Sequence, residues 1–184
     1  MNQLVIIIIA LVVVGLWLAG LYNLLVRSRN RVKEAWSDID VQFKRRYDLI
    51  PNLVETVKGY AEHERGTLDA VIQARAKAMN AQSVTEHAQA ENMLTGALKS
   101  LFALSEAYPQ LRAVESFAKL QDELSDTENK IQAARRFYNT NTMTLNTQVE
   151  QFPTNVVSGM FGFKKEDFFQ LEDTAQREPV KVSF

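Results

Sequence analysis

Residues 117–152 read FAKLQDELSDTENKIQAARRFYNTNTMTLNTQVEQF, and a large apolar side chain recurs at every seventh position. No glycine or proline interrupts residues 110–151, and Pro109 and Pro153 flank them. A sustained seven-residue period is typical of long helices that pack side by side at a shallow angle. The period predicts one helix from Pro109 to about residue 152, with this core row: Phe117, Leu124, Ile131, Tyr138, Leu145 and Phe152.

The neighbouring row of this helix is mixed, because polar side chains lie between two valines. A dimeric coiled coil would have an apolar companion row, so we expect one strut of a bundle with a polar layer midway. The row comprises Val114, Gln121, Glu128, Arg135, Thr142 and Val149.

An earlier segment, residues 27–64, has two apolar rows of the same period, and both continue through Pro51. Proline inside a helix removes one hydrogen bond and kinks the axis without changing the facial register, so we expect a kinked helix. Arg46 occupies a step of the first row, which matches the row of Glu128 and Arg135. Since buried charges need partners, we expect Arg46 to face Glu128 and to align the two longest helices. The alternative is that these long side chains reach solvent from the bundle edge.

The intervening segments also indicate helices. Gly66 and Thr67 predict a break before a helix over residues 68–80. Ser83 with Glu86 three residues later fits a capping box, which predicts a helix over residues 84–108. With no β-hairpin signal, the fold class is all-α: an elongated bundle of long antiparallel helices over residues 27–152.

The chain starts with an apolar run, residues 4–26, that contains no charged side chain. A helix of this length rises roughly 34 Å, enough for a bilayer core of about 30 Å. Residues 1–3 carry no basic side chain and no small-residue cleavage site follows the run, so we expect an uncleaved transmembrane helix rather than a signal peptide.

Basic residues follow this run closely: Arg27, Arg29, Arg31 and Lys33, then Lys44, Arg45 and Arg46. The positive-inside rule predicts residues 1–3 outside and the C-terminal domain in the cytoplasm. Alternatively, the basic residues serve the soluble helix and the domain is exported. Because the positive charge clusters beside the membrane, we expect no nucleic-acid partner.

Residues 153–169 form an apolar, aromatic segment, and a flexible tail is expected over residues 170–184. The segment contains Phe161, Phe163, Phe168 and Phe169. Burying one such ring is worth roughly 1.5–3 kcal/mol, so the rings are expected against the protein's own bundle, the bilayer surface or a partner.

Few residues point to catalysis. The chain has no cysteine, which excludes disulfides, thiolate metal sites and a cysteine nucleophile, and it has no phosphate-binding or nucleophile-elbow motif. His87 and Glu91 are four apart and could share a metal, but a catalytic zinc site needs about three protein ligands. We therefore expect no catalytic residue, no cofactor and no metal.

The chain resembles the LemA family of bacterial membrane-anchored proteins along nearly its whole length. The resemblance implies one N-terminal anchor, an all-α bundle and no known enzymatic activity. It rests on the strings RRYDLIPNLVETVKGY from Arg45 to Tyr60, LQDEL from Leu120 to Leu124, ARRFYN from Ala134 to Asn139, and FPTN from Phe152 to Asn155.

These features lead to the hypothesis of a non-catalytic, membrane-anchored helical scaffold. The expected partners are the lipid bilayer and an unidentified membrane or cytoplasmic protein, or further copies of this chain. One alternative is a membrane-remodelling or lipid-surface protein that forms oligomeric arrays. Another is a metal-dependent hydrolase. The residues expected to carry structure or interaction are Arg46, Pro51, Glu128, Arg135, Phe161, Phe163, Phe168 and Phe169.

Overall fold

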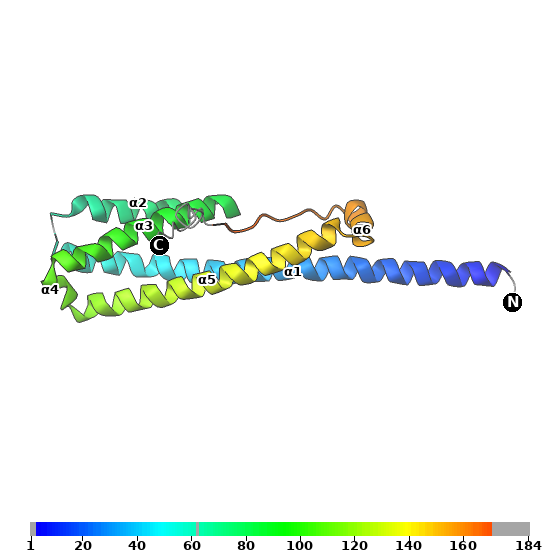
Figure 1. The fold of residues 1–184 in the computed structure, drawn as a ribbon, viewed down its shortest axis with the longest axis horizontal. Helices are drawn as coiled ribbons and strands as arrows, with labels where there is room; N and C mark the ends of the chain where they lie inside the picture. The colour runs from blue at the N-terminus through cyan, green and yellow to red at the C-terminus, as the bar shows by residue number, and fades with distance from the viewer. Residues whose placement is uncertain (1–2, 62, 171–184) are drawn as a thin grey trace, which may run out of the picture. The chain divides into compact units, whose positions relative to one another are not determined.

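The computed structural model describes residues 3–61 and 63–170, and this part of the chain is helical without a strand (Figure 1). The all-α prediction is confirmed. Most of the expected tail, residues 171–184, lies outside the described residues. The helices are α1 (Gln3–Lys58), α2 (Arg65–Met79), α3 (Val84–Ala107), α4 (Pro109–Arg112), α5 (Glu115–Glu150) and α6 (Thr154–Phe161).

The described residues group into two compact units, and the bundle expected over residues 27–152 contributes to both. Unit 1 contains residues 3–39 and 133–168, and unit 2 contains residues 40–132, apart from 62, with 169 and 170. Both α1 and α5 contribute to each unit. The division arises because α2, α3 and α4 belong only to unit 2, whereas α6 belongs only to unit 1.

Unit 2 is built from the end of α1, then α2, α3, α4 and the start of α5 (Figure 1). The turn between α2 and α3 is fixed by the expected capping box, in which Ser83 accepts from the backbone N–H of Glu86 at 3.2 Å. The Glu86 carboxylate accepts in return from the backbone N–H of Ser83. Apolar side chains from all of these helices are buried in the unit, among them Phe43, Ile50, Leu53, Val71, Leu94, Leu101, Leu111, Phe117 and Leu124.

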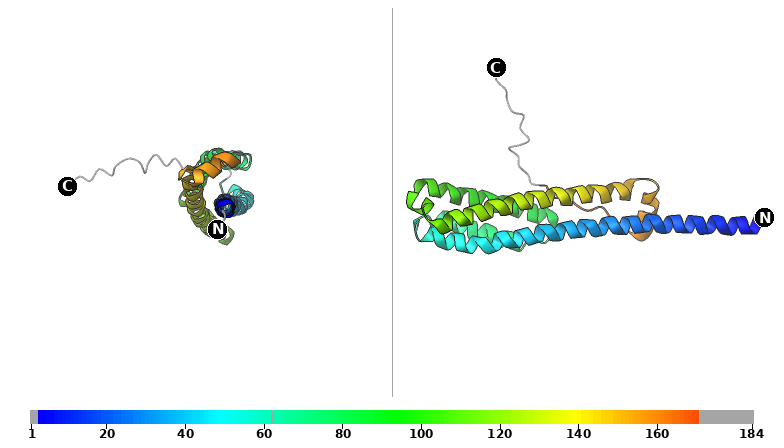
Figure 2. Two further views of the ribbon diagram at one scale, coloured as in Figure 1. Left: turned by 90° about the vertical axis from the view of Figure 1, so that its right-hand side faces the viewer. Right: turned by 90° about the horizontal axis from the view of Figure 1, so that it is seen from below.

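Unit 1 contains the N-terminal part of α1, the C-terminal part of α5, and α6 (Figure 2). In this unit α5 runs antiparallel to α1: Trp36 packs against Tyr138, with ring centroids 5.4 Å apart, and the earlier Leu25 lies in one cluster with the later Val149. Its buried side chains include two members of the predicted core row, Tyr138 and Leu145. The others include Leu25, Val32, Ile39, Val157 and Phe163.

The core row predicted for the long helix is buried at its first five positions, from Phe117 to Leu145. Phe152 is an exception at 76% exposed, because α5 ends at Glu150 and the row has no helix to continue on. The predicted helix also starts later than expected. Pro109 opens the short α4, Ala113 caps it, and α5 begins only at Glu115.

The helix predicted over residues 27–64 is part of α1, which runs through Pro51 and ends at Lys58. The break therefore lies before α2 and not at Gly66, which is inside that helix. Tyr60 was expected on the apolar row, but it lies beyond the helix end and is 49% exposed.

The N-terminal part of α1 is, by length and composition, able to cross a membrane, and it is the one helix of the described residues with this property. Large apolar side chains from Leu4 to Leu24 are exposed on it. Such a surface suits lipid rather than water, in agreement with the predicted span over residues 4–26.

Candidate functional site

A charged cluster lies in the interior of unit 2, where Arg46 of α1 meets side chains of α3 and α5. Its guanidinium Nη1 lies 3.1 Å from Oε2 of Glu91 and 2.9 Å from Oε2 of Glu128. Its Nη2 donates a hydrogen bond to the Thr95 hydroxyl at 2.8 Å. The Arg46 and Glu91 side chains are 5% and 3% exposed, so this charge pair is removed from solvent screening. One arginine thus links three helices.

Tyr47, the next residue on α1, completes the cluster by donating its phenol hydrogen to the other carboxylate oxygen of Glu91. Burial, followed by the nearby Glu91 charge, raises the pKa of Tyr47 far above its usual range. The phenol therefore stays protonated and remains a donor at any physiological pH. Both Glu91 oxygens are thus engaged within the protein, one by Arg46 and the other by Tyr47.

Pro51 contributes to the same region through its missing N–H. In an uninterrupted helix the residue at this position would donate to the carbonyl of Tyr47, four residues earlier. Here the Nε of Arg75, on α2, donates to that carbonyl at 2.8 Å. The proline thus leaves the Tyr47 carbonyl of α1 available as an acceptor, and the hydrogen bond from Arg75 to this carbonyl holds α2 against α1.

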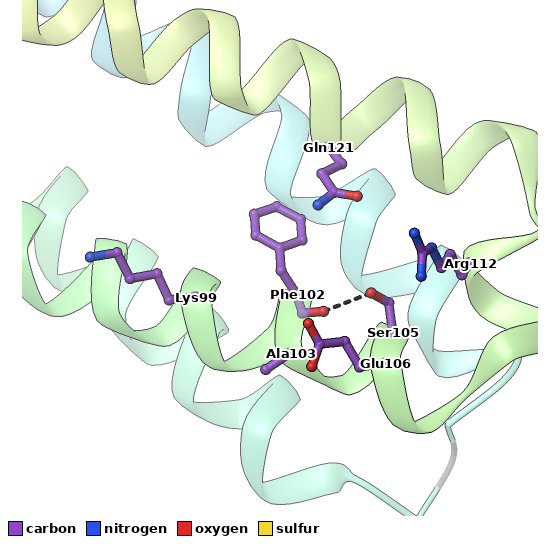
Figure 3. Close-up of a pocket in the computed structure, with 7 residues that line it drawn as sticks. All are labelled: Lys99, Phe102, Ala103, Ser105, Glu106, Arg112 and Gln121. Atoms are coloured by element: carbon purple, nitrogen blue, oxygen red, sulfur yellow. Dashed lines mark hydrogen bonds between the residues drawn. The ribbon is translucent and has the colours of Figure 1, made fainter.

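A groove lies beside the cluster, between α3 and α5. Its inner part has a volume of about 260 Å³ and is lined by Arg46, Thr95, Leu98 and Leu124 among others. Its outer part, about 440 Å³, has these lining residues: Lys99, Phe102, Ala103, Ser105, Glu106, Arg112 and Gln121 (Figure 3). Lys99, Phe102 and Gln121 line both parts, so the two form one continuous groove.

The groove combines an apolar floor with charged edges. Phe102 extends from α3 toward Gln121 of α5 (Figure 3). Its ring packs edge-on against the buried Phe117, with centroids 6.2 Å apart. Lysine, arginine and glutamate side chains surround it. Binding sites in proteins commonly combine apolar side chains with a few polar groups in this way.

The expected pairing of Arg46 with Glu128 is present, at 2.9 Å. Arg135, from the same row, lies in unit 1 and is half-buried there, so it belongs to a different environment. Pro51 is an exposed position within α1. These positions follow from the helical period, which sets the face of each residue.

The sequence interpretation missed Glu91, Tyr47 and Thr95 as partners of Arg46. A signal for Glu91 existed, because it lies seven residues before Leu98 on the apolar face of α3. A charge on an apolar row needs a buried partner. Glu91 had been considered only with His87, as a metal-ligand pair.

His87 instead stacks on Phe43, with ring centroids 5.7 Å apart, while Phe169 packs on the same ring at 6.1 Å. Burial lowers the pKa of His87, against the opposing effect of Asp40 and Glu86. Within residues 3–61 and 63–170, no group of three or more His, Asp or Glu side chains is arranged to hold a metal ion.

The aromatic segment is divided between burial and exposure. Phe163 and Phe169 are buried, whereas Phe161 is 60% and Phe168 39% exposed. In unit 1, Tyr22 packs against Phe161 and Phe163, and the Arg29 guanidinium lies 5.0 Å from the Phe163 ring centre. The other basic residues after the apolar run, Arg27, Arg31 and Lys33, are exposed on α1.

Comparison with known proteins gives one family and several relatives. The model of the LemA family matches residues 35–184. Protein LemA of Metamycoplasma hominis is 29% identical over 158 residues, which is 84% of this chain and 71% of that protein. Magnetosome protein MamQ 2 of Paramagnetospirillum magneticum is 24% identical, and magnetosome protein MamQ of Magnetospirillum gryphiswaldense is 23% identical. Each of these two alignments covers 86% of this chain and 68% of the relative.

Proposed function

This chain belongs to the LemA family, and on that premise we propose that it is a non-enzymatic, membrane-anchored interaction protein. In this proposal the apolar start of α1 is the anchor, and the groove between α3 and α5 receives a segment of a protein partner. The partner is a membrane or cytoplasmic protein, or a second copy of this chain.

The observation that carries the proposal is the groove itself. Its floor presents Phe102 together with Leu98 and Leu124, while Lys99 and Glu106 stand at its edges. Partner segments commonly bind through apolar anchors surrounded by polar contacts. The Arg46 cluster lies at the inner end of the groove and links its two walls, because Thr95 and Glu91 are on α3 and Glu128 is on α5. A wall held in this way is preorganised for binding.

Two further considerations support a role in binding over catalysis. The names of the relatives indicate no reaction. The buried charges of unit 2 are also neutralised by one another, since Arg46 is paired with two carboxylates and Tyr47 is bonded to one of them. Groups engaged in this way hold helices together and are poorly placed to exchange protons with a substrate.

The proposed location is the bacterial cytoplasmic membrane, with the N-terminus outside and the residues that follow the anchor, from Arg27 onward, on the cytoplasmic side. The basic residues Arg27, Arg29, Arg31 and Lys33 support this orientation, because positive charge close to a span is retained in the cytoplasm.

Site-specific photocrosslinking in cells tests the groove. A photoreactive residue replaces Gln121, which lines the groove, or Glu123, which is exposed on another side of the same helix. We expect a discrete crosslinked product from position 121 that is absent from position 123. A product of twice the chain's mass identifies a second copy as the partner. The same products from both positions would contradict a binding role for the groove.

A second candidate function is a lipid-surface protein that assembles into arrays. The exposed apolar side chains of α6, among them Met160 at 71% exposed, favour this alternative. Solution size in a mild detergent separates the two functions, because arrays are large and polydisperse whereas a partner complex has one defined mass.

A further inference from the structure

Helix α6 lies against the last turns of the apolar run of α1. Val157 of α6 forms a buried cluster with Leu25 of α1 and with Phe163, and Leu21 and Val26 of α1 pack on that cluster. The rings of Tyr22 and Phe161 are 4.8 Å apart. All of these α1 residues precede the first charged residue, Arg27. Helix α6 is therefore at the level where the membrane span ends.

One face of α6 packs on unit 1 and the opposite face is open. Thr154, Val157 and Ser158 are buried. Val156 and Met160, four residues apart on α6, are 52% and 71% exposed, and Phe152, which lies just before the helix begins, is 76% exposed. Residues spaced by four lie on one side of a helix. The outer face thus presents an apolar stripe rather than the polar surface usual for a short surface helix.

Helix α6 lies in an uncharged stretch of the chain that is followed directly by basic residues. Residues 151–163 contain no charged side chain, and Lys164 and Lys165 follow directly. Lys165 bonds the Glu150 carboxylate at 2.6 Å, at the end of α5. Arg29 lies over the Phe163 ring. An uncharged apolar stripe bordered by exposed basic residues is the pattern of an interfacial membrane element.

We propose that the outer face of α6 inserts into the interfacial layer of the bilayer that α1 spans, and that it forms a second membrane contact. The stripe of Val156 and Met160 contacts the upper acyl chains, together with the exposed Phe152 that precedes α6, and Arg29 and Lys164 lie among the headgroups. The bilayer is the occupant because α6 packs through Phe161 on Tyr22, at the end of a run of α1 whose large apolar side chains are exposed.

This inference rests on α1 spanning a membrane, as in the proposed function, but it does not depend on which way the chain is oriented. A single helix leaves the rest of the chain free to tilt against the bilayer. A second apolar contact beside the anchor restricts this tilt, and it explains why two large apolar residues, Met160 and Phe152, are exposed.

Tryptophan quenching by brominated lipids tests the proposal in the full chain. The native tryptophans are Trp17, inside the span, and Trp36, which is replaced by Phe in every variant. Met160→Trp, made with Trp17→Phe, reports on α6, and Val156→Trp is a second reporter on the same stripe. Phe137→Trp is the matched control, because Phe137 is 51% exposed on α5 beside Tyr138, which packs on Trp36 well beyond the span.

Each variant is reconstituted in vesicles of phosphatidylcholine and phosphatidylglycerol, with or without bromine on the upper acyl chains. We expect Trp17 and both α6 reporters to lose about half of their emission or more in brominated vesicles, and Phe137→Trp to lose little. If Trp17 is quenched and the α6 reporters behave as Phe137→Trp does, the proposal is wrong and the stripe faces a protein partner. If Trp17 itself is not quenched, α1 does not span and the premise fails as well.

Discussion

Removal of the buried carboxylate of Glu91 should destabilise unit 2 strongly. In Glu91→Gln the side chain keeps its size but loses its charge, and an NH2 donor replaces one of the two oxygens that accept from Arg46 and Tyr47. Loss of one partner from a buried ion pair costs about 3–5 kcal/mol, because the remaining charge is left without compensation. We expect about 3 kcal/mol, at the lower end, since Glu128 is 28% exposed and still neutralises Arg46 at 2.9 Å.

Urea titration of the full chain in a mild detergent, followed by far-UV circular dichroism, measures this change in the free energy of unfolding. Glu123→Gln is the control, because this exposed carboxylate should change stability by no more than about 0.5 kcal/mol. Replacement of both Arg46 and Glu91 by Met should cost less than the sum of the single changes, since neither of these two buried charges is left behind and the remaining Glu128 is 28% exposed. A Glu91→Gln protein with the control's stability would refute the argument that this charge pair holds α1 to α3.

Three further outcomes are expected. Alkaline phosphatase fused after the last residue should be inactive while a fluorescent protein fused there is bright; the reverse would place the C-terminal domain outside. Pro51→Ala should raise the free energy of unfolding by about 1–2 kcal/mol in urea titrations. Removal of the proline relieves a cost of ~3 kcal/mol in the helix interior, but the new N–H competes with Arg75 for the Tyr47 carbonyl and offsets part of it. The increase should be larger when Arg75→Met is also present, and a protein that no longer folds would contradict this reasoning. Burial lowers the pKa of His87 below its ordinary 6.5, so the folded state loses stability as the pH falls below 6.5. His87→Gln should reduce this loss of stability in thermal melts between pH 7 and 5. A variant with the parent's pH profile would contradict the role of His87.

The sequence was informative where a regular period or a local motif determines the structure. The seven-residue repeat identified the buried row from Phe117 to Leu145, because a helical period assigns each residue to a face. The Ser83 capping box is a local interaction and was predicted to the residue. The Arg46–Glu128 pair followed from two matched rows and the need of buried charges for partners.

Boundaries that depend on tertiary packing were not predictable. Nothing in the residues around Ala113 disfavours a helix, yet α4 ends there and α5 begins at Glu115. Leu111 is fully buried, which indicates that packing of this turn determines the break. Helix α6 was missed because its eight residues include Gly159 and show too short a period to separate a helix from an apolar turn.

The groove could not be predicted, because its walls are α3 and α5 and no period along one helix reveals the space between two. Its lining residues also appear ordinary in sequence: Gln121 lies in a mixed row, and Lys99 on an exposed face. Glu91 was considered only with His87, as a metal-ligand pair, and only the contact with Arg46 shows why a carboxylate is present on the apolar face of α3.

The central claim, that the protein acts by binding through the groove between α3 and α5, is tested most directly by the native mass of the complex isolated from cells in a mild detergent. Ala103 lies in the groove and is exposed, so Ala103→Trp fills the groove without entering the core. Ala70→Trp, on the exposed side of α2, is the matched control. We predict a discrete mass above the 20.9 kDa of one chain for the parent and for Ala70→Trp, and its loss in Ala103→Trp. The same mass in all three proteins would contradict the account.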